Sequence, residues 1–221
     1  MRRGYRGFFG SVVCLSLGLA GCETMPPPTS TTFVYKNYAV ADGSAVAGEG
    51  NHVLFNDSPL TLAGNGLKVG DALRDVKIAQ ADLSLVNIAH TKGEGKVRII
   101  SVVPSLDTPV CEQQTHYLSE KNKGLDKMVE LITVSVDTPF AQKRFAREAK
   151  IENVTFLSDY RGAEFGKAHG LFLKDPHILT RAVIVVDAQN TVRYLQVTPE
   201  LVQLPDMEEA FRVARVLISA S

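Results

Sequence analysis

The residue best placed to do chemistry is Cys111, one of only three cysteines in the 221-residue chain. It follows the loop Pro104–Pro109, which comes after a β-branched run, and it stands where a helix is expected to begin. In the first turn of a helix, free N–H groups and the positive end of the helix dipole favour the thiolate, which is the nucleophilic form. The alternative is an inert thiol buried in the core.

Two neighbours of Cys111 carry groups that could assist it. Thr108 could donate to the thiolate, hold an incoming oxygen atom, or simply cap the helix, which is the commoner role of a threonine at such a position. We expect His116, five residues after the cysteine, to face solvent rather than to act as a general base. A thiol–disulfide oxidoreductase is disfavoured, because the chain has no Cys-x-x-Cys pair.

Hydrophobic patterning predicts the elements that position these residues. Residues 97–103 and 129–136 are apolar, β-branched runs typical of buried strands, and helical patterns follow each of them. Turn residues predict a small hairpin near residues 52–63 and a second one around residues 187–190, and the chain ends in an amphipathic helix. This order predicts an α/β fold: a thioredoxin-like mixed central sheet flanked by helices, with an N-terminal β-hairpin.

The N-terminus has the pattern of an export signal. Three arginines within the first six positions precede an apolar run from Phe8 to Ala20, too short to span a bilayer. Leu19–Cys22 resembles the lipobox of bacterial lipoproteins, which implies cleavage before Cys22 and lipid on its thiol. An ordinary signal peptide, or a buried helix with an incidental cysteine, is the alternative. Glu23 favours the periplasmic face of the outer membrane as the destination of this exported lipoprotein.

Composition divides the chain into three parts. Residues 1–21 are expected to be the signal peptide, residues 22–50 a tether rich in Pro, Ser, Thr and Gly, and residues 51–221 the folded domain. The apolar patch Phe33–Tyr35 interrupts the tether, and the sequence leaves open whether it docks on the domain. Lys+Arg and Asp+Glu both number 24, so no general attraction to nucleic acid is expected.

Several motifs resemble one family. Pro104–Cys111 is similar to the Pro-x-x-x-Thr-x-x-Cys signature of peroxiredoxins, and its Ser-x-Asp-Thr-x-Val-Cys form resembles the thiol peroxidase branch. Further stretches resemble that branch in the same order: Ser135–Phe145, Tyr160–Gly166 and Arg181–Asp187. The resemblance runs from about Asn51 to the C-terminus.

The resemblance implies a thioredoxin-fold peroxidase that uses neither metal nor other cofactor. Cys111 would attack a hydroperoxide, Thr108 and Arg181 would bind and polarise it, and Pro104 would shield the sulfur. Without the resemblance, Arg181 would be read as a surface charge beside a strand. Members of the family often form homodimers, so a homodimer is expected here.

The chain departs from the family at the resolving cysteine. Many members carry it just after the Arg-Phe pair, where this chain has Ala146. Since Cys14 lies in the expected signal peptide and Cys22 would carry lipid, Cys111 is left as the single free thiol. The sequence therefore predicts a one-cysteine peroxidase whose sulfenic acid is reduced by an external thiol or a thioredoxin-like protein. The alternative is a non-catalytic or redox-sensing lipoprotein on the same scaffold.

Overall fold

The computed structural model describes residues 32–91 and 95–220. One compact unit begins at Val34 and continues to the end of the described chain. The expected signal peptide and the expected lipid attachment at Cys22 lie outside the described residues. Among the helices that are described, none is long and apolar enough to cross a membrane.

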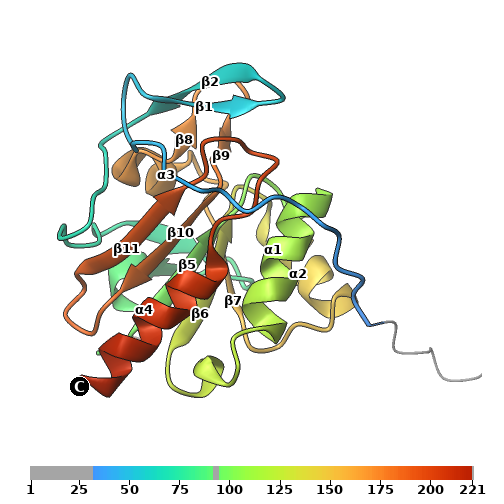
Figure 1. The fold of residues 1–221 in the computed structure, drawn as a ribbon, viewed down its shortest axis with the longest axis vertical. Coiled ribbons are helices and arrows are strands. Elements are labelled where there is room, and N and C mark those ends of the chain that lie inside the picture. Colours follow the sequence, from blue (N-terminus) through green and yellow to red (C-terminus); the bar gives the residue numbers. More distant parts are fainter. Residues whose placement is uncertain (1–31, 92–94, 221) are drawn as a thin grey trace, which may run out of the picture. The chain divides into compact units, whose positions relative to one another are not determined.

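A mixed seven-stranded sheet forms the centre of the compact unit (Figure 1). Its strands are β3 (Lys77–Ala79), β4 (Leu85–Asn87), β5 (Arg98–Val102), β6 (Glu130–Ser135), β7 (Thr155–Ser158), β10 (Ala182–Val186) and β11 (Val192–Val197). They lie in the order β11-β10-β5-β6-β7-β3-β4. The β5–β6 and β6–β7 pairs are parallel, and the remaining pairs are antiparallel. The predicted mixed sheet is therefore confirmed, although β3 and the edge strand β4 were not predicted.

The helices cover both faces of this sheet. They are α1 (Pro109–Glu120), α2 (Pro139–Glu148), α3 (Glu164–His169) and α4 (Met207–Ser219), with short 3-10 helices at Ile88–His90 and Leu125–Lys127. Side chains of α1, α2 and α4 share one apolar cluster with Ile99 of β5, whereas Phe165 of α3 belongs to the other cluster, with Ile100. Successive residues of a strand point to opposite faces, so α1, α2 and α4 cover one face and α3 the other.

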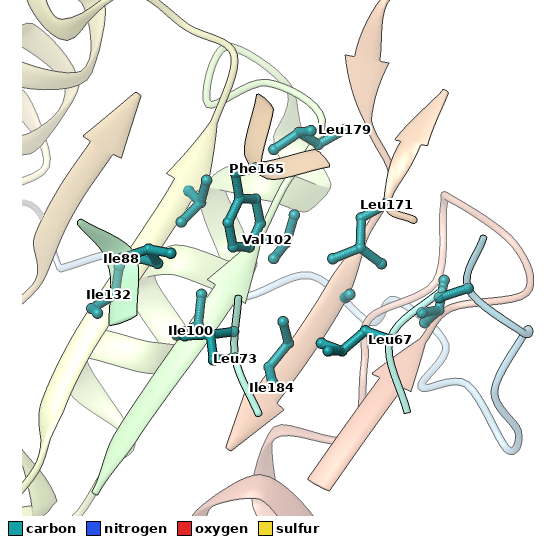
Figure 2. Packing of buried hydrophobic residues seen from close by; sticks show 14 of the residues in the cluster. Leu67, Leu73, Ile88, Ile100, Val102, Ile132, Phe165, Leu171, Leu179 and Ile184 are labelled. Carbon is teal, nitrogen blue, oxygen red and sulfur yellow. The ribbon is translucent and has the colours of Figure 1, made fainter. Parts of the chain in front are cut away.

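A second, smaller sheet extends the predicted N-terminal hairpin. Strands β1 (His52–Phe55) and β2 (Ser58–Ala63) pair in antiparallel register, as expected, and β2 continues to β8 (Phe172–Leu173) and β9 (Ile178–Leu179). Figure 2 shows Leu179 and Leu171 beside Phe165 and Val102 of the central sheet's core. The hairpin is thus joined to the main core rather than lying apart from it.

The compact unit begins earlier than the sequence predicts. Residues 34–50 were expected to belong to a flexible tether, but Ala41 and Ala47 are buried. The Ala41 N–H donates to the Leu204 carbonyl, and the Ala45 N–H donates to the Val197 carbonyl. The segment is ordered here because its backbone pairs with the backbone at the end of β11 and in the following loop.

Candidate active site

The register of the sheet brings Arg181 next to the loop that precedes Cys111. Strand β10 pairs antiparallel with β5, and Ala182 lies opposite Val102. Arg181, the residue before β10, therefore lies beside the residues that follow β5. A pairing between segments about 80 positions apart places Arg181 at the start of α1.

The loop between β5 and α1 is held by Asp137, which follows the neighbouring strand β6. Ser105 Oγ donates to Asp137 Oδ1 at 2.8 Å, and the Leu106 N–H donates to Asp137 Oδ2 at 2.8 Å. Parallel strands end at the same edge of the sheet, so the ends of β5 and β6 meet here. The carboxylate fixes the path of the loop into the helix.

Thr108 is the N-cap residue of α1, and Cys111 is the third residue of the helix. The Thr108 side chain makes no capping bond; its hydroxyl donates to the Ser105 carbonyl at 2.9 Å. The Thr108 hydroxyl therefore does not donate to the Cys111 thiolate, which was one of the roles considered from the sequence. Because the hydroxyl proton is engaged, the oxygen of Thr108 presents acceptor lone pairs.

Arg181 lies directly against the sulfur. Its Nη2 donates to Cys111 Sγ at 3.3 Å, its Nη1 donates to Gln114 Oε1 at 2.8 Å, and its Nε donates to the Leu201 carbonyl at 2.9 Å. Cys111 is fully buried and Arg181 is 3% exposed. The surface-charge interpretation of Arg181 is therefore wrong, and the guanidinium is fixed in a position that stabilises negative charge on the sulfur.

Gln114, which the sequence analysis did not single out, holds this arrangement in place. It is completely buried, and its Nε2 donates to Ser101 Oγ at 2.8 Å. Its side-chain oxygen is thereby turned towards Arg181. The only sequence signal was its position: three residues after Cys111, on the same face of the helix.

An apolar cavity of about 450 Å³ opens onto this group. Among the described residues, Thr108 and Arg181 supply the polar side chains of its lining. The apolar lining residues are Phe55, Leu60, Pro104, Pro109, Val110, Pro176, Ile178, Leu201 and Val202. Three of the predicted site residues therefore meet in one cavity, with Cys111 bonded to the guanidinium that lines it.

His116 does not face solvent as expected. It is 5% exposed, and its Nδ1 lies 2.7 Å from Glu120 Oε1, one turn further along the helix. Its ring also contacts Phe145 of α2 edge to face. These contacts give His116 a structural position between α1 and α2. In the described part of the chain, no group of three or more His, Cys, Asp or Glu side chains is arranged to hold a metal ion.

Comparison with known proteins identifies the family. Residues 68–211 match the Redoxin family model. The chain is 43% identical over 166 residues to the thiol peroxidase of Halalkalibacterium halodurans, covering 75% of this chain and 98% of that protein. It is 39% identical over 165 residues to the thiol peroxidase of Streptococcus pneumoniae strain R6, covering 75% of this chain and 99% of that protein.

Solved structures agree with the fold and the family. A peroxiredoxin-like protein from Aquifex aeolicus superposes with a TM-score of 0.71 at 35% identity, covering 79% of this chain and 99% of that one. A thiol peroxidase from Chromobacterium violaceum, 20% identical, shares the fold with a TM-score of 0.67, covering 77% of this chain and 98% of that one. This chain belongs to the thiol peroxidases, which are peroxiredoxin-type oxidoreductases of the Redoxin family.

Proposed function

We propose that this protein reduces hydrogen peroxide and organic hydroperoxides through Cys111 by a one-cysteine mechanism. The observation that carries the proposal is the 3.3 Å contact between Arg181 Nη2 and Cys111 Sγ beside the apolar cavity. A thiolate stabilised by a buried guanidinium, next to a space that admits a small molecule, is what peroxide reduction requires.

In the first step, the Cys111 thiolate attacks the terminal oxygen of the hydroperoxide. The S–O bond forms as the O–O bond breaks, and the sulfur is oxidised by two electrons to sulfenic acid. The departing oxygen takes up a proton and leaves as water or an alcohol. Arg181 stabilises the negative charge that shifts from sulfur to oxygen, and the Thr108 oxygen accepts a hydrogen bond from the peroxide O–H. The buried ring of Pro104 shields the sulfur from bulk water.

The lining of the cavity favours organic hydroperoxides. Nine of its eleven residues are apolar, and a volume of about 450 Å³ is in the range of small-molecule sites. An alkyl or acyl chain placed there would bury apolar surface, at about 25 cal/mol per Å² removed from water. We therefore include organic hydroperoxides, those of lipids among them, in the substrate class.

The second step requires an external thiol. Beyond residue 22, Cys111 is the only cysteine in the chain. A reductant thiolate attacks the sulfenic sulfur to give a mixed disulfide and water, and a second thiol then releases Cys111 and the oxidised reductant. A low-molecular-weight thiol or a thioredoxin-like protein can supply both equivalents.

We also propose export as a lipoprotein, anchored by lipid on Cys22 at the periplasmic face of the outer membrane, and assembly as a homodimer. The signal-like residues 1–21 and the lipobox resemblance support the anchor. Replacement Cys22→Ser should move the protein from the membrane fraction to the soluble fraction and abolish lipid labelling. Light scattering of the purified protein measures its oligomeric state.

The test of the catalytic proposal uses the mature protein and a stoichiometric hydroperoxide. We expect Cys111 to gain one oxygen, seen by intact mass and by sulfenic-acid trapping, far faster than free cysteine does. Cys111→Ser should abolish the reaction. A thiol that reacts no faster than free cysteine would instead support the non-catalytic alternative, a binding or scaffold function.

A further inference from the structure

Residues 35–45, here called the strap, lie across the compact unit and bind two elements of the active site. At one end the contact is with α1. The backbone N–H of Lys36 donates to Gln113 Oε1 at 2.6 Å, and Gln113 Nε2 donates back to the Lys36 carbonyl at 2.8 Å. A side chain that pairs with both backbone groups of one residue fixes the strap in position and register.

Tyr35 strengthens this end of the strap. Its hydroxyl donates to Glu120 Oε2 at 2.8 Å, and its ring packs edge to face on Tyr117. The ammonium of Lys121 lies 4.6 Å from the ring centroid. Burial, followed by the hydrogen bond to Glu120, raises the pKa of Tyr35, so the hydroxyl remains a donor at physiological pH. The strap is therefore bound to the middle and the end of α1.

The other end of the strap is bound to the loop that follows β11. The Leu204 N–H donates to the Ala39 carbonyl at 2.8 Å, and the Ala41 N–H donates to the Leu204 carbonyl at 2.9 Å. Gln196 Nε2 donates to the carbonyls of Ala41 and Gly43, both at 3.0 Å. Val40, which lies between Ala39 and Ala41, lines a cavity of about 70 Å³ together with Tyr117 of α1 and Leu204. Packing between α1 and this loop is incomplete there, and the strap bridges the gap.

The same two elements hold Arg181. Gln114, next to Gln113 on α1, accepts from Arg181 Nη1, and the carbonyl of Leu201, in the loop that contains Leu204, accepts from Nε. If α1 and the loop move apart, the guanidinium cannot keep both bonds and its contact with Cys111. We propose that the strap is a positioning element of the peroxidase site: by joining α1 to the 199–205 loop, it holds Arg181 in register with Cys111.

This inference rests on the proposed roles of Cys111 and Arg181. It predicts that the strap affects the rate of peroxide attack rather than only stability, since a misplacement of about 1 Å at a reacting centre can cost up to roughly 100-fold in rate. It also predicts that the effect of the strap depends on the guanidinium. In a variant without Arg181, loss of the strap contacts should therefore not change the rate further.

The experiment is a double-mutant cycle in the full mature chain. Gln113→Met keeps the length of the side chain and removes both bonds to Lys36, and Tyr35→Ala removes the second contact at a half-buried position. Each is made alone and with Arg181→Ala. The control is Ser119→Ala, which removes a hydrogen bond between Ser119 Oγ and Asn153 Oδ1 from the same helix, away from the strap. The second-order rate of Cys111 oxidation is measured, together with unfolding by urea.

We expect Gln113→Met and Tyr35→Ala each to slow oxidation about 5- to 10-fold, consistent with a partial misplacement, and to have no further effect in the Arg181→Ala background. Ser119→Ala should retain the wild-type rate. The inference would be overturned if the strap substitutions slowed oxidation equally in the wild-type and Arg181→Ala backgrounds. It would also be overturned if neither strap substitution changed the rate. Full activity of Cys111→Ser would instead overturn the proposed function, so the two failures are distinguishable.

Discussion

Replacing Arg181 by lysine tests the site most directly, because it keeps the charge and removes the forked geometry. A lysine has one nitrogen in place of the three that reach Leu201, Gln114 and Cys111. It cannot occupy all three positions, so at least one buried acceptor loses its partner.

The hydrogen bonds of Arg181 set the expected size of the changes in stability and in oxidation rate. Leaving a buried acceptor unpaired costs about 1–3 kcal/mol, so losing both the Gln114 and the Leu201 partner should reduce the free energy of unfolding by about 2–6 kcal/mol. Removing one donor aimed at developing charge costs roughly 100- to 1,000-fold in rate. We expect Arg181→Lys to remain folded, since a domain of this size is typically stable by about 5–15 kcal/mol, and to be slow.

Single-turnover oxidation of Cys111 measures the rate, and urea denaturation measures the stability. Arg144→Lys is the matched control: Arg144 pairs with Asp107 near the same loop at 3.2 Å, but both side chains are exposed. Such a pair contributes about 0–1 kcal/mol, so this variant should behave as wild type. A rate for Arg181→Lys equal to that of Arg144→Lys would refute the assignment of charge stabilisation to the guanidinium.

Three further outcomes follow from the described contacts. Thr108→Val should slow oxidation about 10-fold or more by removing the acceptor for the peroxide O–H, whereas Thr108→Ser should retain most of the rate in the same assay. Phe55→Glu, at the exposed edge of the cavity, should lower the rate with an aromatic hydroperoxide by about 10-fold and leave the hydrogen peroxide rate unchanged. Burial lowers the pKa of His169 from 6.5 to about 4, so its stabilising contribution is complete above pH 6.5 and lost as the pH falls towards 4. The stability difference between wild type and His169→Gln, measured by urea denaturation, should therefore shrink by about 3 kcal/mol from pH 7 to pH 4.

The sequence predicted the elements that carry strong local signals. The β-branched runs of β5 and β6 and the turn between β10 and β11 were identified, because burial on both faces and tight turns each restrict composition. Strands β3 and β4 have three residues each, too few to show a period. β3 is a strand because Ala79 pairs with Ser158 of β7, and β4 is a strand because it pairs with β3.

The parts of the site that were missed depend on partners distant in the sequence. Gln114 is polar and helical, and it is buried only because Arg181, 67 positions later, supplies its hydrogen bond. The burial of Arg181 likewise depends on the Leu201 carbonyl. By composition the strap is predicted to be a linker. It is ordered by backbone pairing with Leu204 and by the side chains of Gln113 and Gln196. No local pattern encodes such pairings.

The burial of Cys111 places a demand on the reducing half of the cycle that does not apply to oxidation. In the proposed mechanism the hydroperoxide approaches Cys111 from the cavity lined by Arg181, so the new oxygen should lie on the cavity side. A thiolate that displaces this oxygen must attack in line with the S–O bond, from the side of the sulfur away from the cavity. Cys111 is fully buried and shares an apolar cluster with Leu106 and Leu118, so little space is open to that approach. We therefore expect reduction to require a local opening of the first turn of α1, and oxidation to require that turn to be closed. We expect urea, at concentrations below the unfolding transition, to accelerate reduction of the sulfenic acid by a small thiol and to slow its formation. Double-mixing single-turnover kinetics separates the two rates, and a parallel fall in both would show that the reductant reaches the sulfur without opening the helix.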